Sequence, residues 1–170
     1  MKAELYWVQA VGAGRLAIMP HPRGGDWLED EIRSLREDGV ETLVSLLPTE
    51  EMIELALAEE PTLCAANGID YISFPIVDRS VPHSRASLLS LLDQLCDLLH
   101  GGRGVAVHCR AGIGRSGLFV AAVLVREGIR PAEAIARVSA ARGLETPDTA
   151  EQSEWVAACA PRRAGAQEQD

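Results

Sequence analysis

Short apolar runs alternate along the chain with longer amphipathic stretches. Five of these runs are predicted strands, at residues 5–8, 16–18, 41–46, 71–74 and 105–108. The runs at 41–46 and 105–108 contain β-branched residues and little charge, which is typical of strands buried on both faces of a sheet. Their alternation with helices predicts an α/β fold with a central, mostly parallel sheet flanked by helices.

Six helices are predicted between and after these strands. Their ranges are 26–38, 49–58, 84–100, 115–128, 131–142 and 149–160. Asp26 and Glu29 have the spacing of a capping box at the start of the first helix. The second helix is expected to end before Pro61, and Ser84 is expected to cap the third.

The composition indicates one globular domain. The 170 residues are 47% hydrophobic and 24% charged, which is ordinary for a soluble domain of this length. We expect the domain to occupy residues 1–160 and the polar residues 161–170 to form a frayed tail. The longest apolar run, 118–125, is far shorter than the ~20 residues of a membrane-spanning helix. With no recognisable signal peptide, the sequence predicts a cytoplasmic protein.

Charge and cysteine content narrow the function further. A net charge of −9 argues against nucleic acid and against anionic membrane surfaces as partners, and we expect a monomer. The four cysteines include no C-x-x-C pair, so a disulfide framework or a zinc site is not expected. A single reactive thiol is the better hypothesis.

One segment, residues 105–117, combines several features of an anion site. A buried strand leads to Cys109, and Gly112 and Gly114 allow backbone N–H groups to converge in the loop that follows. A helix then begins at Arg115, so its N-terminal N–H groups and a guanidinium face the same point. Such a setting favours the nucleophilic thiolate form of a cysteine. A lone cysteine is more often a small core residue, but these residues together favour a site.

The run from His108 to Ser116 resembles the signature loop of the cysteine-dependent protein tyrosine phosphatase superfamily, C-x-x-x-x-x-R flanked by His and Ser. The size of the chain is similar to the compact dual-specificity branch, and the chain most resembles bacterial enzymes similar to the cyclin-dependent-kinase-associated phosphatases. The resemblance implies a phosphotyrosine phosphatase-like fold. It implies catalytic roles for Cys109, Asp78, Arg115, Ser116, His108 and Gln152, and phosphate binding by Arg110, Ala111, Gly112, Ile113, Gly114 and Arg115.

Asp78 is the candidate general acid. It lies 31 positions before Cys109, where the family carries an aspartate on a mobile loop, and Pro75 and Pro82 bracket it. The tryptophan of larger family members is absent here, which suits the compact branch. Outside this family, a solvated loop carboxylate would be the simpler interpretation of Asp78.

Several neighbouring residues have two interpretations each. Gln152 corresponds to a glutamine that positions the hydrolytic water in some members, but with Thr149 it also has capping-box spacing. Either Glu50 or Glu51 could bind the Arg115 guanidinium from behind, or simply lie solvated at a helix start. Arg110 is expected at the rim. Phosphoinositide-cleaving relatives carry a second basic residue in the loop where this chain has Ile113, which disfavours inositol lipids.

The resemblance implies hydrolysis of phosphotyrosine, and also of phosphoserine or phosphothreonine, through a cysteinyl-phosphate intermediate and without metal or organic cofactor. The substrate would be a phosphoprotein or a small phosphomonoester. The alternatives are an inert phosphate-recognition module, a phosphatase for a non-protein phosphate such as an inositol phosphate, a rhodanese-type sulfurtransferase and an arsenate reductase. Cys64 could protect an oxidised Cys109 through a disulfide, although a buried core thiol is the simpler interpretation.

Overall fold

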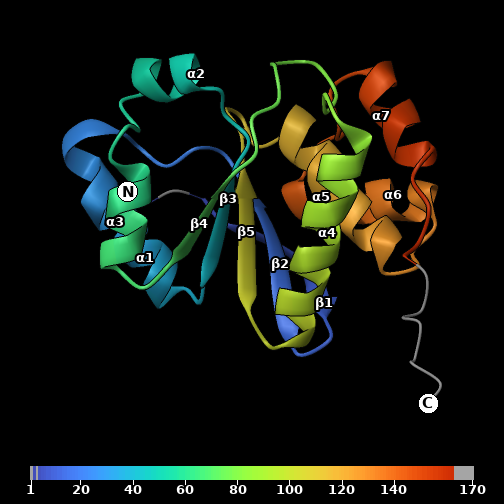
Figure 1. Cartoon of the computed structure of the whole chain (residues 1–170), viewed down its shortest axis with the longest axis horizontal. Helices are drawn as coiled ribbons and strands as arrows, with labels where there is room; N and C mark the ends of the chain where they lie inside the picture. Colours follow the sequence, from blue (N-terminus) through green and yellow to red (C-terminus); the bar gives the residue numbers. More distant parts are fainter. Residues whose placement is uncertain (1, 3, 163–170) are drawn as a thin grey trace.

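The computed structural model describes residues 2 and 4–162 of the chain, and Figure 1 shows its arrangement. One sheet holds five strands in the order β1-β2-β5-β3-β4. The strands are β1 (Tyr6–Val11), β2 (Gly14–Met19), β3 (Thr42–Ser45), β4 (Asp70–Ser73) and β5 (Gly104–His108). Only β1 runs antiparallel to its neighbour, so the predicted α/β fold with a mostly parallel sheet is confirmed.

Helices cover both faces of this sheet. They are α1 (Leu28–Glu37), α2 (Thr49–Glu54), α3 (Glu60–Ala66), α4 (Arg85–His100), α5 (Gly114–Arg126), α6 (Pro131–Arg142) and α7 (Ala150–Ala157), with a 3₁₀ turn at Gly25–Trp27. In Figure 1, α1 and α3 lie on one side of the sheet, and α4, α5 and α6 lie on the other. The connection after β3 leads to α2, and the connection after β5 leads to α5.

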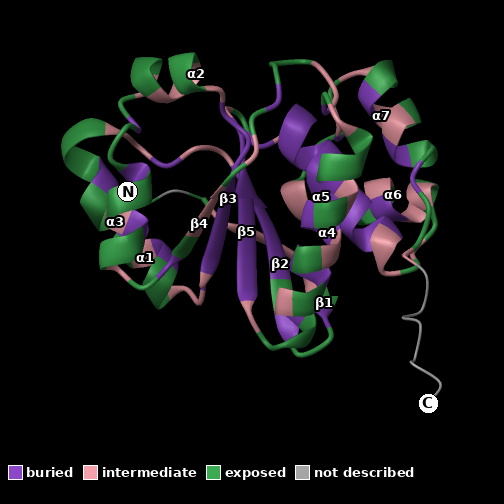
Figure 2. Cartoon of the chain, viewed as in Figure 1, coloured by how far each residue is buried: buried purple, intermediate pink, exposed green. Residues whose placement is uncertain are grey.

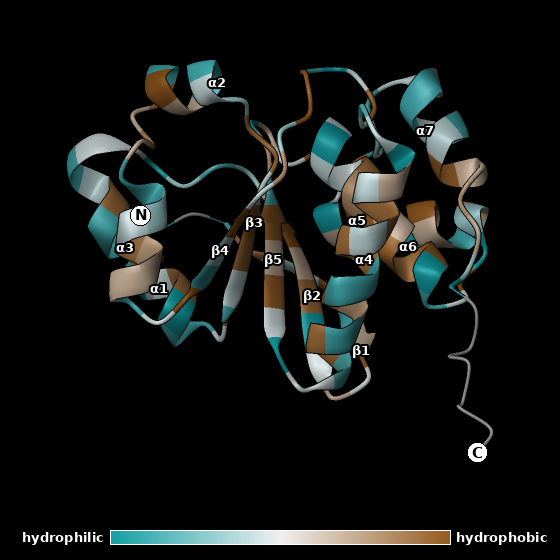
Figure 3. Cartoon of the chain, viewed as in Figure 1, coloured by the Kyte–Doolittle hydropathy of each residue, from teal (hydrophilic) through white to brown (hydrophobic). Residues whose placement is uncertain are grey.

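The core is densest around the three central strands and α5. Every residue of α5 except Arg126 is buried, and β3 and β5 are buried along their whole lengths. Figure 3 shows the same strands and the middle of α5 as the most hydrophobic parts of the fold. Full burial of each large apolar side chain contributes roughly 1.5–3 kcal/mol. The end of β5 and the start of α5 are therefore held firmly in place.

Two features of the first half of the chain differ from the prediction. The capping box at Asp26 and Glu29 is wrong, because Asp26 lies in the 3₁₀ turn and Trp27 precedes α1 without a side-chain cap. The helix predicted at 49–58 ends at Glu54, where the chain turns through Ala56 with a positive φ of 56°.

A third difference is α3, a helix that the sequence pattern did not predict. Pro61 lies in the first turn of α3, where a missing N–H removes no intrahelical hydrogen bond. The sequence predicts a helix that ends before Pro61, whereas in the structure Pro61 stands at the start of the next helix. This correction matters for the site, because α3 carries Glu60 and Cys64.

The remaining helix ends agree closely with the sequence. The Ser84 hydroxyl accepts a hydrogen bond from the Ser87 N–H at the start of α4, and α6 begins at Pro131. Residues 163–170 of the predicted tail lie outside the described residues. Arg162, just before them, donates its backbone N–H to the Arg126 carbonyl over 3.0 Å. Within the described part of the chain, no helix is long and apolar enough to cross a membrane.

Candidate active site

The candidate nucleophile stands at the carboxyl end of the central strand. His108, the last residue of β5, pairs with Met19 of β2 and Ser45 of β3, and Cys109 follows it directly. Cys109 is only 2% exposed, yet it lines a pocket of about 160 Å³. The residues around this pocket are Asp78, Arg79, Cys109, Arg110, Ala111, Gly114, Arg115 and Asp148. The sulfur thus lies at the floor of an open pocket.

The loop after Cys109 depends on two glycines. Gly112 has a φ of +68°, and a Cβ there would lie 2.5 Å from the Met19 carbonyl carbon and the Pro20 nitrogen. A Cβ on Gly114 would lie 2.5 Å from an Asp148 carboxylate oxygen. A larger residue is therefore excluded at Gly112, where the close atoms are backbone, whereas at Gly114 it would require the Asp148 side chain to move. The orphan N–H groups and dipole of that helix end favour an anion in the pocket.

Arg115 is a buried cation whose guanidinium is fixed from behind. Its side chain is 2% exposed, and its two terminal nitrogens lie 2.6 and 3.0 Å from the oxygens of Glu51. Nη1 also donates to the Ile76 carbonyl over 3.0 Å. Burial alone would lower the pKa of Arg115, but the hydrogen bonds to Glu51 raise it above its ordinary value. Of the two predicted partners, Glu50 and Glu51, the structure selects Glu51.

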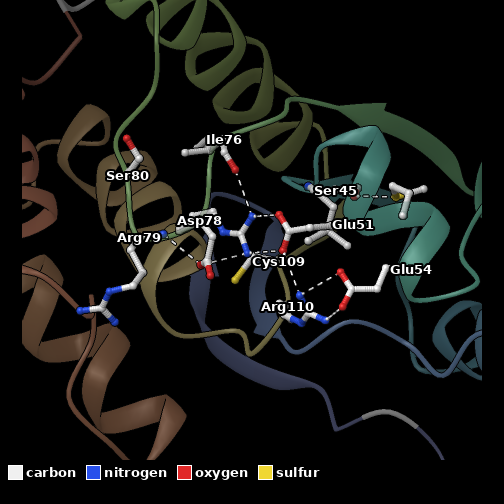
Figure 4. Close-up of polar contacts among 12 residues, drawn as sticks. Ser45, Glu51, Glu54, Ile76, Asp78, Arg79, Ser80, Cys109 and Arg110 are labelled. Atoms are coloured by element: carbon white, nitrogen blue, oxygen red, sulfur yellow. Dashed lines mark hydrogen bonds and ion pairs between the residues drawn. The ribbon is translucent and has the colours of Figure 1, made fainter.

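Asp78 reaches the pocket from the opposite side. Its Oδ1 lies 3.2 Å from Arg115 Nη2 and accepts the backbone N–H of Arg79 over 2.9 Å. Figure 4 shows Asp78 beside the Cys109 sulfur, with the Arg79 side chain directed away. The Asp78 side chain is 60% exposed, and Arg79 has a positive φ of 58°. The structure therefore brings the predicted acid to the predicted nucleophile on an exposed, strained turn.

His108 and Glu60 form a buried pair behind the nucleophile. His108 Nε2 lies 2.8 Å from Glu60 Oε1, and both side chains are fully buried. The two atoms are close, but their geometry is not that of an aligned hydrogen bond. Burial alone would lower the pKa of His108, but the negative charge of Glu60 raises it above its ordinary value. On its other side, Nδ1 donates to the Cys109 carbonyl over 3.1 Å.

Gln152 completes the cap of α7. Its Oε1 accepts the backbone N–H groups of Asp148 and Thr149, each over 3.1 Å, while Thr149 caps the Gln152 N–H in return. Its Nε2 donates to the Ser80 carbonyl over 3.1 Å, which ties α7 to the Asp78 loop. The predicted capping box is confirmed.

Ser116 and Arg110, two further residues predicted for the site, both lie close to Cys109 in the chain. Ser116 is fully buried in the first turn of α5, yet its hydroxyl has no hydrogen-bond partner among residues 2 and 4–162. This hydroxyl therefore makes no hydrogen bond to the Cys109 sulfur. Arg110 is at the rim as predicted, paired with Glu54 over 2.8 Å.

Sequence reasoning missed three contributors to the site. Glu60 escaped notice because α3 was not predicted. Asp148 is an exposed carboxylate on the pocket wall, and only its place just before a helix N-cap could have indicated it. Arg142 donates from Nε and Nη2 to the carbonyls of Gly112 and Ala111, over 3.0 and 3.1 Å. Arg142 thus stabilises the outer side of the loop at residues 109–114, which we call the phosphate loop.

All four cysteines are free and buried. Cys64 lies in α3 one turn after Glu60, and burial together with the charge of Glu60 raises its pKa to about 12. Burial also raises the pKa of Cys96 to about 12. Neither thiol is readily ionised near neutral pH. Within the described ranges, no three His, Cys, Asp or Glu residues are grouped to hold a metal ion.

The fold and this pocket have the arrangement found in cysteine-dependent phosphatases of the tyrosine and dual-specificity class, and the comparisons with known proteins agree. The family described as "Polymorphic toxin system, DSP-PTPase phosphatase" matches residues 17–129, so the chain belongs to that family. A tyrosine phosphatase, 197R of Invertebrate iridescent virus 6, is 30% identical over 116 residues, which are 66% of this chain and 41% of that protein. The chain thus spans about two fifths of the length of this curated relative.

Solved structures show the same fold over nearly the whole chain. A kinase-associated phosphatase with its catalytic cysteine replaced by serine has a TM-score of 0.82 at 21% identity, covering 92% of this chain and 93% of its own. A protein tyrosine phosphatase from Leishmania major has a TM-score of 0.73 at 24% identity, covering 91% of this chain and 98% of its own. The predicted phosphatase-like fold is confirmed.

Proposed function

We propose that this protein hydrolyses phosphomonoesters of proteins, phosphotyrosine foremost and phosphoserine or phosphothreonine as well, through a phosphorylated Cys109. One observation carries the proposal. Cys109 lies at the floor of a pocket that also holds a buried, Glu51-braced Arg115 and the carboxylate of Asp78. A nucleophile, an anion-binding fork and an acid thus meet around a space of about 160 Å³.

In the first step, phosphate binds to the N–H groups of residues 110–115 and to the Arg115 guanidinium. The Cys109 thiolate attacks phosphorus, the S–P bond forms and the P–O ester bond breaks. Asp78 gives its proton to the departing oxygen. Because Asp78 Oδ1 is the present partner of Arg115 Nη2 at 3.2 Å, a bound phosphate takes that nitrogen and releases Asp78 towards the leaving group.

In the second step, water attacks phosphorus and the S–P bond breaks, which returns the thiolate and releases inorganic phosphate. Asp78, now a carboxylate, accepts the proton of this water. Gln152 is the residue proposed to position this water, although in the present structure it is fully buried behind the pocket wall and donates to the Ser80 carbonyl. The unpaired hydroxyl of Ser116 is the donor proposed for the departing thiolate.

The test is hydrolysis of p-nitrophenyl phosphate and of phosphotyrosine, phosphoserine and phosphothreonine peptides in a buffer that contains a chelator. We expect turnover by the wild type and its loss, by about 10⁴-fold or more, in Cys109→Ser. Cys96→Ser replaces another buried thiol and is expected to keep its activity. If the wild type binds phosphate but does not turn over, the protein is a recognition module instead. If it cleaves inositol phosphates in preference to the peptides, its substrate is a non-protein phosphate.

The proposal also covers the oligomeric state of the protein and its location in the cell. We propose that the protein acts as a monomer in the cytoplasm and does not bind nucleic acid, and the net charge of −9 supports the last of these points. Analytical ultracentrifugation should give a single species of 18.3 kDa. A stable dimer would contradict this part of the proposal alone.

A further inference from the structure

A buried pair of charges connects α3 to the residue beside the nucleophile. Glu60 lies in the first turn of α3 and His108 ends β5, and their side chains meet at 2.8 Å with no exposure to solvent. The family resemblance gave His108 a role but no partner. Glu60 comes from the helix that the sequence did not predict.

The surroundings leave Glu60 with one cation to balance it. The Tyr71 hydroxyl lies close enough to interact with its carboxylate, but neither carboxylate oxygen makes an aligned hydrogen bond within the described part of the chain. A buried carboxylate is expensive unless a cation faces it, and His108 is the neighbouring group that can carry a positive charge at 2.8 Å. Burial alone would lower the pKa of His108, but the Glu60 carboxylate at 2.8 Å raises it above its ordinary value, which favours the charged pair.

Other groups around the pair oppose or support that charge. The Arg115 guanidinium on α5 disfavours a second cation at His108. Cys64 on α3 and Tyr71 on β4 are held in their neutral forms, since burial and the charge of Glu60 raise the pKa of Cys64 to about 12 and raise that of Tyr71 as well. The neighbouring strands present Ser45 and the apolar Met19 opposite His108. Glu60 is thus the carboxylate that faces and stabilises a protonated His108.

The opposite edge of the imidazole holds the nucleophile residue itself. Nδ1 donates to the Cys109 carbonyl over 3.1 Å, so the ring is fixed between Glu60 and the backbone that bears the sulfur. A positive charge next to a thiolate stabilises it. We propose that Glu60 is a positioning residue that keeps His108 protonated and oriented, so that His108 in turn stabilises the Cys109 thiolate. This inference rests on the proposed role of Cys109 as the nucleophile.

Two experiments test it without measuring turnover. In the full chain, we expect NMR of ¹³C-labelled histidine, assigned with His108→Gln, to show His108 protonated at pH 7. A neutral His108 at that pH would overturn the proposal, because Glu60 would then not keep the imidazole charged. This measurement uses the wild type, so it stands even where a Glu60 variant does not fold.

The second experiment follows the rate of iodoacetate reaction at Cys109 against pH. Glu60→Gln should move the midpoint upward by about one pH unit or more, which is the effect expected from loss of one nearby charge. Glu59→Gln changes the exposed neighbour and should leave the midpoint in place. The double variant Glu60→Gln/His108→Gln should shift no further than His108→Gln alone. A folded Glu60→Gln protein with the wild-type midpoint would contradict the inference, whereas loss of phosphatase turnover in the wild type would contradict the proposed function instead.

Discussion

The two halves of the candidate site are built in opposite ways. Cys109, Gly112 and Arg115 lie within seven consecutive positions between a central strand and a helix that is buried along almost its whole length. Asp78 lies on an exposed loop and is held by two contacts, one to Arg115 and one to the Arg79 backbone. The first region is a rigid anion site, and the second is an exposed loop that contacts this site through Asp78.

The difference suits the two roles proposed for these regions, phosphate binding for the first and proton transfer for the second. A phosphate needs converging donors that are fixed before it arrives, because preorganised donors cost no rearrangement in the transition state. The acid must meet leaving groups of different shapes and then allow product to depart, so a movable loop suits it. Substitutions in the two regions should therefore have different kinetic and structural effects.

The largest effect should come from the rigid region. Arg115→Lys keeps the charge but loses the planar fork that Glu51 holds, and kcat/KM should fall by about 10²–10³-fold. Arg110→Lys, at the exposed rim, should cost less than about tenfold. Steady-state hydrolysis of p-nitrophenyl phosphate measures both. Equal losses in the two variants would contradict the distinction between the buried fork and the rim.

The next effect should come from the movable region. Asp78→Asn removes the proton donor, and kcat should fall by about 10²-fold for poor leaving groups such as phosphoserine peptides. It should fall far less for p-nitrophenyl phosphate, whose leaving group departs without protonation. A plot of log kcat against leaving-group pKa should steepen in the variant. An unchanged slope would remove the acid role from Asp78.

Glycine-to-alanine substitutions should destabilise the fold more in the phosphate loop than at an ordinary helix end. Gly112→Ala introduces both a strained φ and a Cβ 2.5 Å from two backbone atoms, and should destabilise the fold by about 3 kcal/mol or more. Gly128→Ala has a φ of +95° but open space around its Cβ, and should cost about 1 kcal/mol. Urea unfolding of the two variants provides the comparison. Equal losses would mean that the close approach to β2 is not needed.

The smallest effect concerns pH. Because the pKa of His108 is raised in the folded state, its contribution to stability is complete below the unfolded value of ~6.5 and is lost as pH rises through the folded value. Between these limits the free energy of unfolding should fall by up to about 1.4 kcal/mol per pH unit. The His108→Gln protein should lack this slope. A wild type that gains stability over the same interval would contradict the charged pair.

Local sequence predicted the rigid region well and the rest less well. The segment around Cys109 was correctly placed because strand, turn and helix follow one another within a few residues. Glu51 was foreseen only as one of two candidates, because sequence does not show which face of α2 meets Arg115. Glu60 and Asp148 were missed because they join the site only through tertiary packing.

The errors have physical causes of the same kind. Pro61 suits either the end of one helix or the first turn of the next, and only the packing of α3 on β4 decides. The Asp26–Glu29 spacing fits a cap, but a 3₁₀ turn took its place. In contrast, the caps at Ser84 and Thr149 were correct, since both serve long or well-packed helices with matching sequence signals.

The most direct test is selective alkylation of the four cysteines by iodoacetate at pH 6, read by mass spectrometry with and without inorganic phosphate. Cys109 should react first, and phosphate should slow its reaction. Cys64 and Cys96 should remain intact, because burial raises the pKa of each to about 12. A Cys109 that reacts no faster than these two, or that phosphate does not protect, would contradict a nucleophilic sulfur at the floor of a phosphate pocket.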